Sequence, residues 1–231
     1  MTGPIGDRVF IDGKDAFAYY HADLIDYPTI TAGEITASYN DLPGLLIPYQ
    51  NTQAAKTATW SFYVHGETRE RREINTAALI EACRFATLKI QYSDLEYLSI
   101  LTEVISEPTG IDQFNHVQLT FATVQRGRLR TVSLPQDKVY CETLVDAPCR
   151  ITLKPASAVS NFTILGITIN KLNANDTFVI DGLSRSGNIT RNGNNAFLDT
   201  DLTEFPTLSS GWDELNMSHE IPGEIEYYPV Y

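Results

Sequence analysis

The chain reads Asp-Thr-Phe-Val-Ile-Asp at 176–181, Asn-Gly at 192–193, Phe-Pro-Thr-Leu at 205–208 and Glu-Ile-Glu-Tyr-Tyr-Pro at 224–229. These short β-prone runs are separated by turn residues. The Asn-Gly pair favours a two-residue hairpin, because both positions accept positive φ. Pro206 has no N–H, so a strand ladder cannot continue through it. The pattern predicts short antiparallel strands packed as a β-sandwich or jelly-roll-like domain.

The same spacing extends back through the second half of the chain. Further strands are predicted at 149–154, 161–169, 177–183, 214–218 and 224–228, with turn signals between them and no helical pattern. Residues 131–148 have the composition of a connector, with Pro135 and Pro148. We therefore place a domain boundary here and predict domains at 1–133 and 134–231.

The first domain is predicted to be mainly β with one helix. Residues 57–65 alternate apolar and polar side chains, which is typical of a half-buried strand. Thr68 is a suitable N-cap for a helix over 68–86. A hairpin over 88–105 and a strand over 114–124 follow. The apolar face of the helix is predicted to comprise Ile74, Ala78, Leu79, Ala82, Cys83 and Ala86, with Arg71, Arg72, Asn75 and Glu81 more exposed.

Residues 23–56 have a loop-rich composition, with Pro28, Gly33, Pro43, Gly44 and Pro48. Only a short strand at 34–39 is predicted there. A separate tight turn is predicted at Asp12-Gly13, near the start of the chain. Long loops in a compact domain are usually functional, so we expect this region to contact a partner.

Composition limits the classes of function. The formal net charge is −12, and both predicted domains have an acidic excess. This disfavours binding to phosphate backbones or anionic lipid, which requires clustered Lys or Arg. The chain has no secretory signal pattern and no run of about 18 apolar residues, so we expect no membrane partner and synthesis in the cytoplasm.

Cysteine and histidine usage favours neither a disulfide framework nor a zinc site. Cys83 is predicted to be a core residue, while Cys141 and Cys149 are close enough in sequence to meet across a hairpin. The four histidines, at 21, 65, 116 and 219, have no partner at metal-ligand spacing.

No pattern predicts catalysis. Asp199, Asp201 and Glu204 form an acidic cluster, and a glycosidase could use two of them, but carboxylates near a turn are more often solvated. Asp176 and Asp181 bracket a strand and are weighed as calcium ligands against the commoner role of turn capping. We predict no enzyme activity, with no catalytic, cofactor-binding or metal-binding residues.

Two features are candidate contact surfaces. Arg126, Arg128 and Arg130 form a short basic cluster, interpreted as a solvated turn or as a contact to an acidic neighbouring subunit. Aromatic residues on strands are Tyr63, Tyr92, Tyr97, Tyr227 and Tyr228. Most aromatic residues of a β protein are packed in its core; the alternatives are contacts to a partner and stacking surfaces for sugars, and no cluster in the sequence requires sugar binding.

The C-terminal motifs resemble the C-terminal domain of siphophage distal tail proteins. The matching residues are Phe178-Val-Ile-Asp181, Asn192-Gly193, Phe205-Pro206-x-Leu208 with Gly211, and Ile225-x-Tyr227-Tyr228. The first domain matches that family's ring-forming domain in its order of elements, whereas residues 23–56 do not align. The resemblance implies an N-terminal tail-tube-like β-sandwich or barrel with one packed helix, residues 1–133, and a galectin-like C-terminal β-sandwich, residues 134–231.

The resemblance also implies a structural role in the virion. Such proteins form a hexameric ring that joins the tail tube protein to the tail-tip or tail-associated protein and anchors receptor-binding proteins at the baseplate. DNA passes through the ring without specific binding, and we expect an acidic channel wall. The alternatives are a carbohydrate-binding module that recognises host cell-wall glycans, a tail tube subunit, and a glycoside hydrolase using the Asp199–Glu204 cluster.

Overall fold

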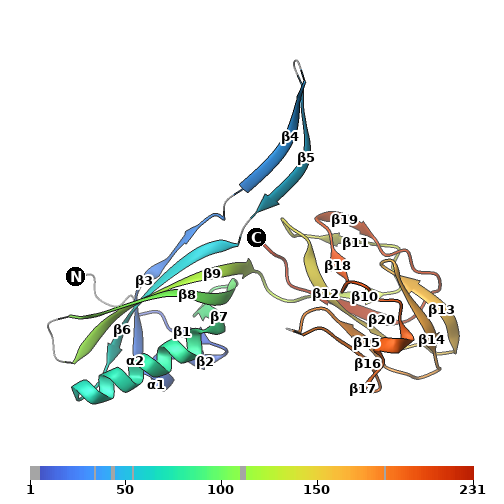
Figure 1. Ribbon diagram of the computed structural model, residues 1–231. Helices are drawn as coiled ribbons and strands as arrows, with labels where there is room; N and C mark the ends of the chain where they lie inside the picture. The colour runs from blue at the N-terminus through green and yellow to red at the C-terminus, as the bar shows by residue number, and fades with distance from the viewer. Residues whose placement is uncertain (1–5, 34, 43–44, 54, 110–112, 185) are drawn as a thin grey trace. The chain divides into compact units, whose positions relative to one another are not determined.

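A computed structural model of the chain describes residues 6–33, 35–42, 45–53, 55–109, 113–184 and 186–231, and it describes 35–42 and 45–53 by their backbone alone. Two compact units, Met1–Gln125 and Arg126–Tyr231, are visible in Figure 1. The prediction of a mainly β chain is confirmed. Among the described residues, no helix is both long enough and apolar enough to span a bilayer.

The first unit is built on a seven-stranded sheet with the order β2-β1-β7-β8-β9-β6-β3. The strands are β1 (Val9–Ile11), β2 (Lys14–Asp15), β3 (Ala22–Thr31), β6 (Lys56–His65), β7 (Phe85–Ile90), β8 (Glu96–Pro108) and β9 (Phe114–Arg126). Asp12 and Gly13 both have positive φ, as the predicted tight turn requires.

Alternation along the central strands places one face of this sheet in the core. Trp60 and Phe62 of β6 lie opposite Leu119 and Val117 of β9, and all four side chains are buried. Helix α2 (Arg69–Cys83) contributes Leu79 and Cys83 to the same cluster. The half-buried strand predicted over 57–65 is therefore confirmed, and its apolar side faces the helix.

The predicted face of α2 is only partly correct. Thr68 is the N-cap, accepting a hydrogen bond from the N–H of Arg71, as predicted. However, Ile74 is exposed, whereas Arg72 and Asn75 are buried. Asn75 donates to the carbonyl of His65 at 2.7 Å, so this amide ties the helix to the end of β6. The hydropathy pattern predicted that Asn75 is exposed, but its hydrogen bond to His65 keeps it buried.

A second, short helix escaped prediction. Helix α1 (Ala16–Tyr20) starts at Asp15, whose carboxylate accepts hydrogen bonds from the N–H groups of Phe17 and Ala18. It ends at His21, which adopts a left-handed conformation. The helix spans five residues, too few for hydrophobic periodicity to appear.

The prediction that 23–56 is mostly loop is wrong in the described part of this region. It forms β3, β4 (Ile35–Leu42) and β5 (Leu45–Gln53), and the two last strands pair with each other. Thr31 pairs with Thr57, and Ile35 pairs with Gln53, so the β4–β5 ladder keeps the register of the β3–β6 ladder. Strands β4 and β5 form a two-stranded sheet of their own, which we call the β4–β5 ribbon. Pro28 and Pro48, two of the residues on which the loop prediction rests, lie within strands.

The second unit contains a large sheet with the order β10-β20-β12-β15-β16-β17, and β18 pairs with the start of β12. Its strands are β10 (Arg130–Leu134), β12 (Ala147–Leu153), β15 (Phe178–Asp181), β16 (Asn188–Arg191), β17 (Asn194–Asn195), β18 (Thr207–Leu208) and β20 (Gly223–Tyr227). Because β10 pairs with β20 along its whole length, this unit begins before the boundary that we placed between 133 and 134.

Two short ladders supply the second layer of a sandwich. They pair β11 (Lys138–Cys141) with β19 (Gly211–Glu214), and β13 (Val159–Ile164) with β14 (Ile167–Leu172). The N–H of Leu165 bonds to the carbonyl of Leu215, which connects the ladders. A 3-10 turn, η1 (Phe197–Asp199), precedes β18.

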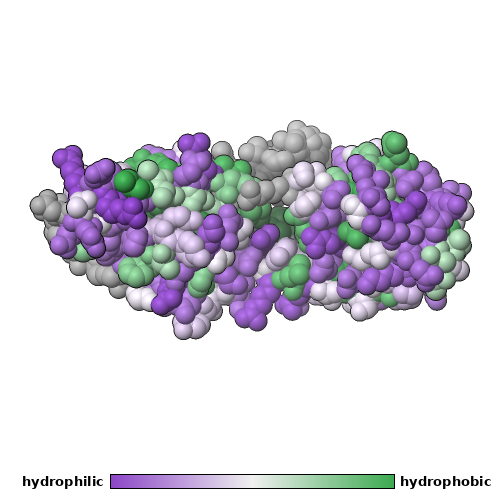
Figure 2. All heavy atoms as spheres, turned by 90° about the horizontal axis from the view of Figure 1, so that it is seen from below, coloured by the Kyte–Doolittle hydropathy of each residue, from purple (hydrophilic) through white to green (hydrophobic). Residues whose placement is uncertain are grey.

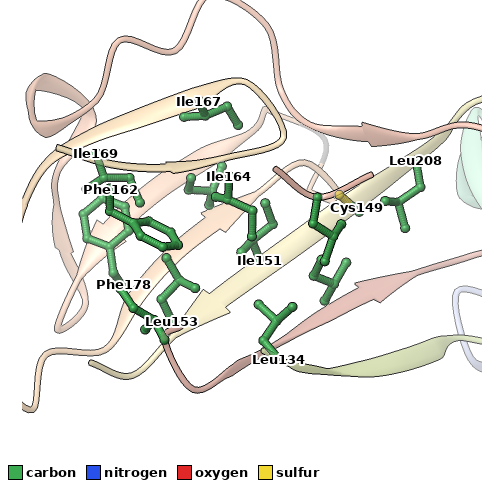
Figure 3. Packing of buried hydrophobic residues seen from close by; sticks show 14 of the residues in the cluster. Leu134, Cys149, Ile151, Leu153, Phe162, Ile164, Ile167, Ile169, Phe178 and Leu208 are labelled. Carbon is green, nitrogen blue, oxygen red and sulfur yellow. The ribbon is translucent and has the colours of Figure 1, made fainter. Parts of the chain in front are cut away.

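The core of the second unit lies between these layers. Figure 3 shows Phe162 and Ile164 of β13 pointing toward Ile151 of β12 and Phe178 of β15. All four side chains are fully buried. The Asn192-Gly193 turn joins β16 and β17 with positive φ at both residues, as predicted. The β-sandwich predicted from the C-terminal motifs is therefore present.

Candidate assembly surfaces

The sheet of the first unit has one face that neither of its described helices, α1 and α2, covers. Helices α1 and α2 both lie against the apolar face (Figure 1). The opposite face carries the alternate residues of the central strands, which are partly exposed: Thr57, Thr59, Ser61, Tyr63 and His65 in β6, and Phe114, His116, Gln118, Thr120, Ala122 and Val124 in β9. We call this set the open face.

The open face is uncharged over these positions of β6 and β9, whereas Asp23 of β3 and the Lys89–Glu96 ion pair of β7 and β8 lie beside them. None of its positions in β6 and β9 is Asp, Glu, Lys or Arg. In the adjacent strand β8, Ile100 and Val104 are exposed. A face made of hydroxyl, amide and apolar groups can lie against another surface without leaving an unpaired charge behind.

One end of the open face carries a row of aromatic rings. His65 lies between Phe17 and Phe114, with ring centroids 6.2 and 4.6 Å away. Tyr63 continues the row from Phe114 to His116. A cavity of about 780 Å³ borders this end and is lined by His21, His65, Gln113 and the start of α2. The Nε2 atom of His65 lies 2.7 Å from the carboxylate of Asp23, a contact that orients the central ring.

Strand β8 exposes a sheet edge. Its pairing with β7 ends at Phe85–Ile100, and a last bond runs from the N–H of Leu101 to the carbonyl of Arg84. Within the described residues, no strand pairs with the remaining outer edge, 102–108. Unpaired strand edges are templates for pairing with another chain. We call residues 102–108 the β8 edge.

Strand β3, at the far end of the sheet, has features that hinder pairing with another strand. Strand β3 has register shifts between Leu24 and Asp26 and between Asp26 and Thr29. It also contains Pro28, which cannot donate a hydrogen bond. Bulges and proline on an edge strand restrict uncontrolled pairing. The two edges of this sheet are therefore unlike.

The acidic cluster proposed for a glycosidase does not assemble as one site. Asp199 forms an ion pair with Arg191 at 3.2 Å. Asp201 accepts a hydrogen bond from the N–H of Thr168 at 2.6 Å, which lowers its pKa. Asp201 and Glu204 line a groove of about 390 Å³, but Asp199 does not.

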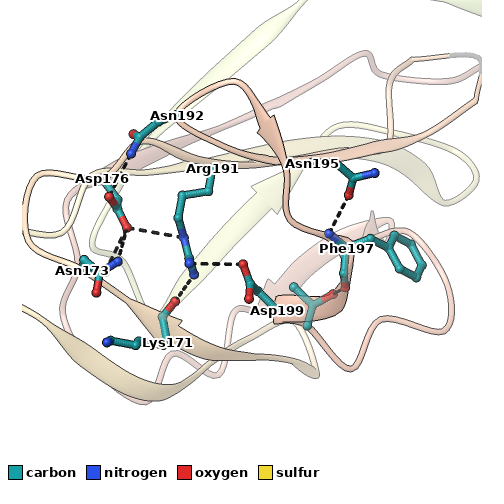
Figure 4. A network of polar contacts seen from close by, with 9 residues as sticks. Lys171, Asn173, Asp176, Arg191, Asn192, Asn195, Phe197 and Asp199 are labelled. Carbon is teal, nitrogen blue, oxygen red and sulfur yellow. Dashed lines mark hydrogen bonds and ion pairs between the residues drawn. The ribbon is translucent and has the colours of Figure 1, made fainter.

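Asp176 and Asp181 cap turns. Figure 4 shows the Asp176 carboxylate accepting hydrogen bonds from the side-chain amides of Asn192 and Asn173, with Arg191 beside it at 3.4 Å. Asp181 accepts from the N–H of Leu183 and from Arg150. Both carboxylates are bound by N–H donors, and the described residues contain no group of acidic, histidine or cysteine side chains that could hold a metal ion.

The basic cluster is engaged within the second unit. Arg126 stacks on Tyr228, with its guanidinium carbon 4.1 Å from the ring centroid. Arg130 forms an ion pair with Glu142 at 3.4 Å. Arg126 and Arg130 therefore each have a partner within their own unit, and the Arg130 side chain stays 55% exposed. Cys141 and Cys149 are buried as free thiols rather than bridged.

The most exposed aromatic pair was not among the predicted contact residues. Of those, Tyr97 and Tyr227 are buried and Tyr92 is exposed. Instead, Tyr140 and Trp212 are both more than half exposed and contact each other across the β11–β19 ladder. They are distant in sequence, so only the strand pairing brings them together. In the view of Figure 2 the surface is mostly hydrophilic, with small separate apolar areas.

Comparison with known proteins gives a likeness only at the level of structure. No protein-family model matches the chain, and no curated protein is detectably similar in sequence. The fold is similar to that of the Dit protein (gp 19.1) of phage SPP1, described as a paradigm of hub adsorption apparatus in phages that infect Gram-positive bacteria. The TM-score is 0.68 at 11% identity, over 97% of this chain and 99% of that one.

Two structures of the phage P2 baseplate in its activated conformation are also similar. The structure with Ca has a TM-score of 0.58 at 11% identity, and the structure with Sr has 0.55 at 12% identity. Each match covers 96% of this chain and 97% of that chain. The chain therefore has the fold of phage distal tail and baseplate proteins, and the resemblance indicated by its C-terminal motifs is confirmed for the fold.

Proposed function

We propose that this protein is a structural component of a phage tail tip. In this proposal it forms a hexameric ring that joins the tail tube protein to tail-tip proteins, anchors receptor-binding proteins and leaves a channel for DNA. The observation that carries the proposal is the agreement of fold with the SPP1 Dit hub protein over 97% of this chain, both units included. A tail tube subunit would require only the first unit's architecture.

The two unlike edges of the first unit support a head-to-tail ring. Such a ring uses two different surfaces of each subunit, so that each interface is heterologous. The β8 edge offers unpaired backbone groups on one side of the sheet, while β3 and the β4–β5 ribbon lie at the other. Addition of a strand at an exposed edge is a common mode of association. We expect the ring interface to form between these elements.

The open face supports passage of DNA without binding. If it lines the channel, residues 57–65 of β6 and 114–124 of β9 present hydroxyl, amide and aromatic groups and no Lys or Arg to hold phosphates. The carboxylates of Asp23 and Glu96 at its margins would repel phosphates, in line with the expected acidic wall.

The direct test is the mass and shape of the purified assembly. Light scattering should give a mass six times that of the 25.8 kDa chain, and electron microscopy should show closed rings with a central opening. Long tubes would support the tail tube alternative. A protein that stays monomeric both alone and with its neighbouring tail proteins would contradict the proposal.

A point variant tests the interface. Val104 is exposed on the β8 edge, and Val104→Lys places a charge where the neighbouring subunit would pack. We expect a folded monomer with an unchanged melting temperature. Leu198→Lys is the matched control, because Leu198 is 93% exposed and belongs to the second unit, outside the β8 edge. Rings formed equally by both variants would exclude the β8 edge from the interface.

A further inference from the structure

The β11–β19 ladder presents two aromatic rings to solvent. Tyr140 and Trp212 are directly opposite each other, with ring centroids 5.4 Å apart and planes at 61°. Tyr140 is 54% exposed and Trp212 is 71% exposed. The residues that alternate with them, Val139 and Cys141, point into the core. Folding leaves more than half of each residue exposed, so core packing alone does not explain two large aromatic residues at these positions.

Charged groups flank the rings at the next position of the ladder. Lys138 lies opposite Glu214 and forms an ion pair with it at 2.8 Å, on the same face as the rings. On the other side, Glu142 is exposed and pairs with Arg130. Each ring therefore has hydrogen-bond donors and acceptors within one ladder step, about 7 Å.

This mixture fits a saccharide better than a protein partner. The centres of protein interfaces are depleted of Lys, Glu and Asp, because burying such groups costs desolvation energy. A sugar ring has an apolar face of C–H groups and a rim of hydroxyls. Stacked on Trp212, it would place hydroxyls near Lys138 and Glu214, which could bond to it while staying in contact with water.

A polar groove continues from this platform. Glu214 and the preceding Asp213 also line the groove of about 390 Å³, which extends along Thr207, Ser209 and Asn216. Its lining is rich in hydroxyl, amide and carboxylate oxygens and has no Lys or Arg. Such a groove has groups to bond the hydroxyls of further sugar units and none to attract an anionic polymer.

We propose that Tyr140 and Trp212 form a binding platform for a neutral oligosaccharide. One sugar ring stacks on Trp212 with Tyr140 as a side wall, and the chain runs past Glu214 into the groove. The platform belongs to the second unit alone, so this proposal does not depend on ring formation. It assigns no cleavage of the sugar.

The test uses the full-length protein and neutral tetrasaccharides of glucose, galactose and N-acetylglucosamine. Isothermal titration calorimetry should detect binding of at least one of them at millimolar or lower concentration. Bound sugar should also protect Trp212 from quenching by acrylamide. The chain's other tryptophan, Trp60, is fully buried, so the exposed fraction of the signal reports on Trp212.

Variants locate the site. Trp212→Ala and Tyr140→Ala should each weaken binding by about tenfold or more, the scale of one lost stacking contact. Leu198→Ala, at an exposed apolar residue of the same unit, should bind as the wild type does. Unchanged melting temperatures and ring mass would show that the losses are local.

Three results would overturn the proposal. They are the absence of heat and of quenching protection with all three sugars, equal binding by Trp212→Ala and wild type, and protection of Trp212 by an added tail protein but by no saccharide. The last would identify the platform as a protein interface.

Discussion

Arg150 donates a hydrogen bond to Asp181 at 3.0 Å, across the ladder between β12 and β15. Its other terminal nitrogen bonds to Glu226 of β20 at 3.1 Å, so one guanidinium joins three adjacent strands. We expect Arg150→Met to lower the free energy of unfolding by about 1 kcal/mol, a modest value because the side chain is about one third exposed. Urea unfolding of the full chain measures it.

A double-mutant cycle separates this ion pair from general effects of the substitution. In an Asp181→Asn background, Arg150→Met should cost less than in the wild type, because part of the interaction is already lost. Equal costs in both backgrounds would show that the two side chains are not coupled.

Acid should destabilise the second unit through its capped carboxylates. The amide of Asn192, the N–H groups of Asn173 and the charge of Arg191 hold the pKa of Asp176 below its usual value. A lowered folded-state pKa gives stability that is present above the unfolded value, about 3.9, and lost as the pH falls through the folded value. Asp176→Asn should therefore destabilise the protein at pH 7 and have a smaller effect below about pH 4.

Unfolding curves for wild type and Asp176→Asn, measured from pH 7 to below pH 4, test whether the stability difference between them shrinks in acid. The two should converge as the pH falls. A difference that is the same at every pH would mean that Asp176 acts only through its shape and not through its charge.

Local patterns predicted much of this fold because the relevant physics is local. Alternation identified β6, Thr68 identified the start of α2, and Asn192-Gly193 identified a hairpin. In each case, neighbours within a few residues determine backbone conformation or side-chain facing. The mainly β class followed from several such signals in succession.

The failures have a different physical origin. Most of the strand structure in β3, β4 and β5 was missed because Pro28, Gly33 and Pro48 indicate loops. In the structure, pairing with the neighbouring strand keeps each of these strands extended. The Tyr140–Trp212 platform depends on pairing between strands far apart in the sequence. No periodicity within either strand could have shown that the rings meet.

Trp60 tests the packing of the first unit. Its indole is fully buried against Phe62 and Tyr97, and among the described atoms none accepts a hydrogen bond from Nε1. A buried donor without an acceptor reduces stability. Trp60→Phe removes this donor along with part of the ring volume, so we expect a net loss of about 1 kcal/mol, well below the 3–5 kcal/mol typical of Phe→Ala in a core.

Phe62→Ala is the matched comparison, because Phe62 is equally buried in the same strand and has no polar atom to lose. Urea unfolding followed by circular dichroism measures both variants. If Trp60→Phe cost as much as Phe62→Ala, the missing hydrogen bond would have no energetic weight.

The ribbon formed by β4 and β5 should be needed for assembly but not for folding. Thr31 and Thr57 are already paired, so an Asn-Gly turn replacing residues 32–56 would close β3 and β6 as an ordinary hairpin. The shorter connection also costs less loop-closure entropy. We therefore expect the free energy of unfolding to change by no more than about 1 kcal/mol. Light scattering should show that this folded variant remains monomeric under conditions in which the wild type forms rings. Rings with the wild-type number of subunits would mean that the β4–β5 ribbon is not needed for the interface.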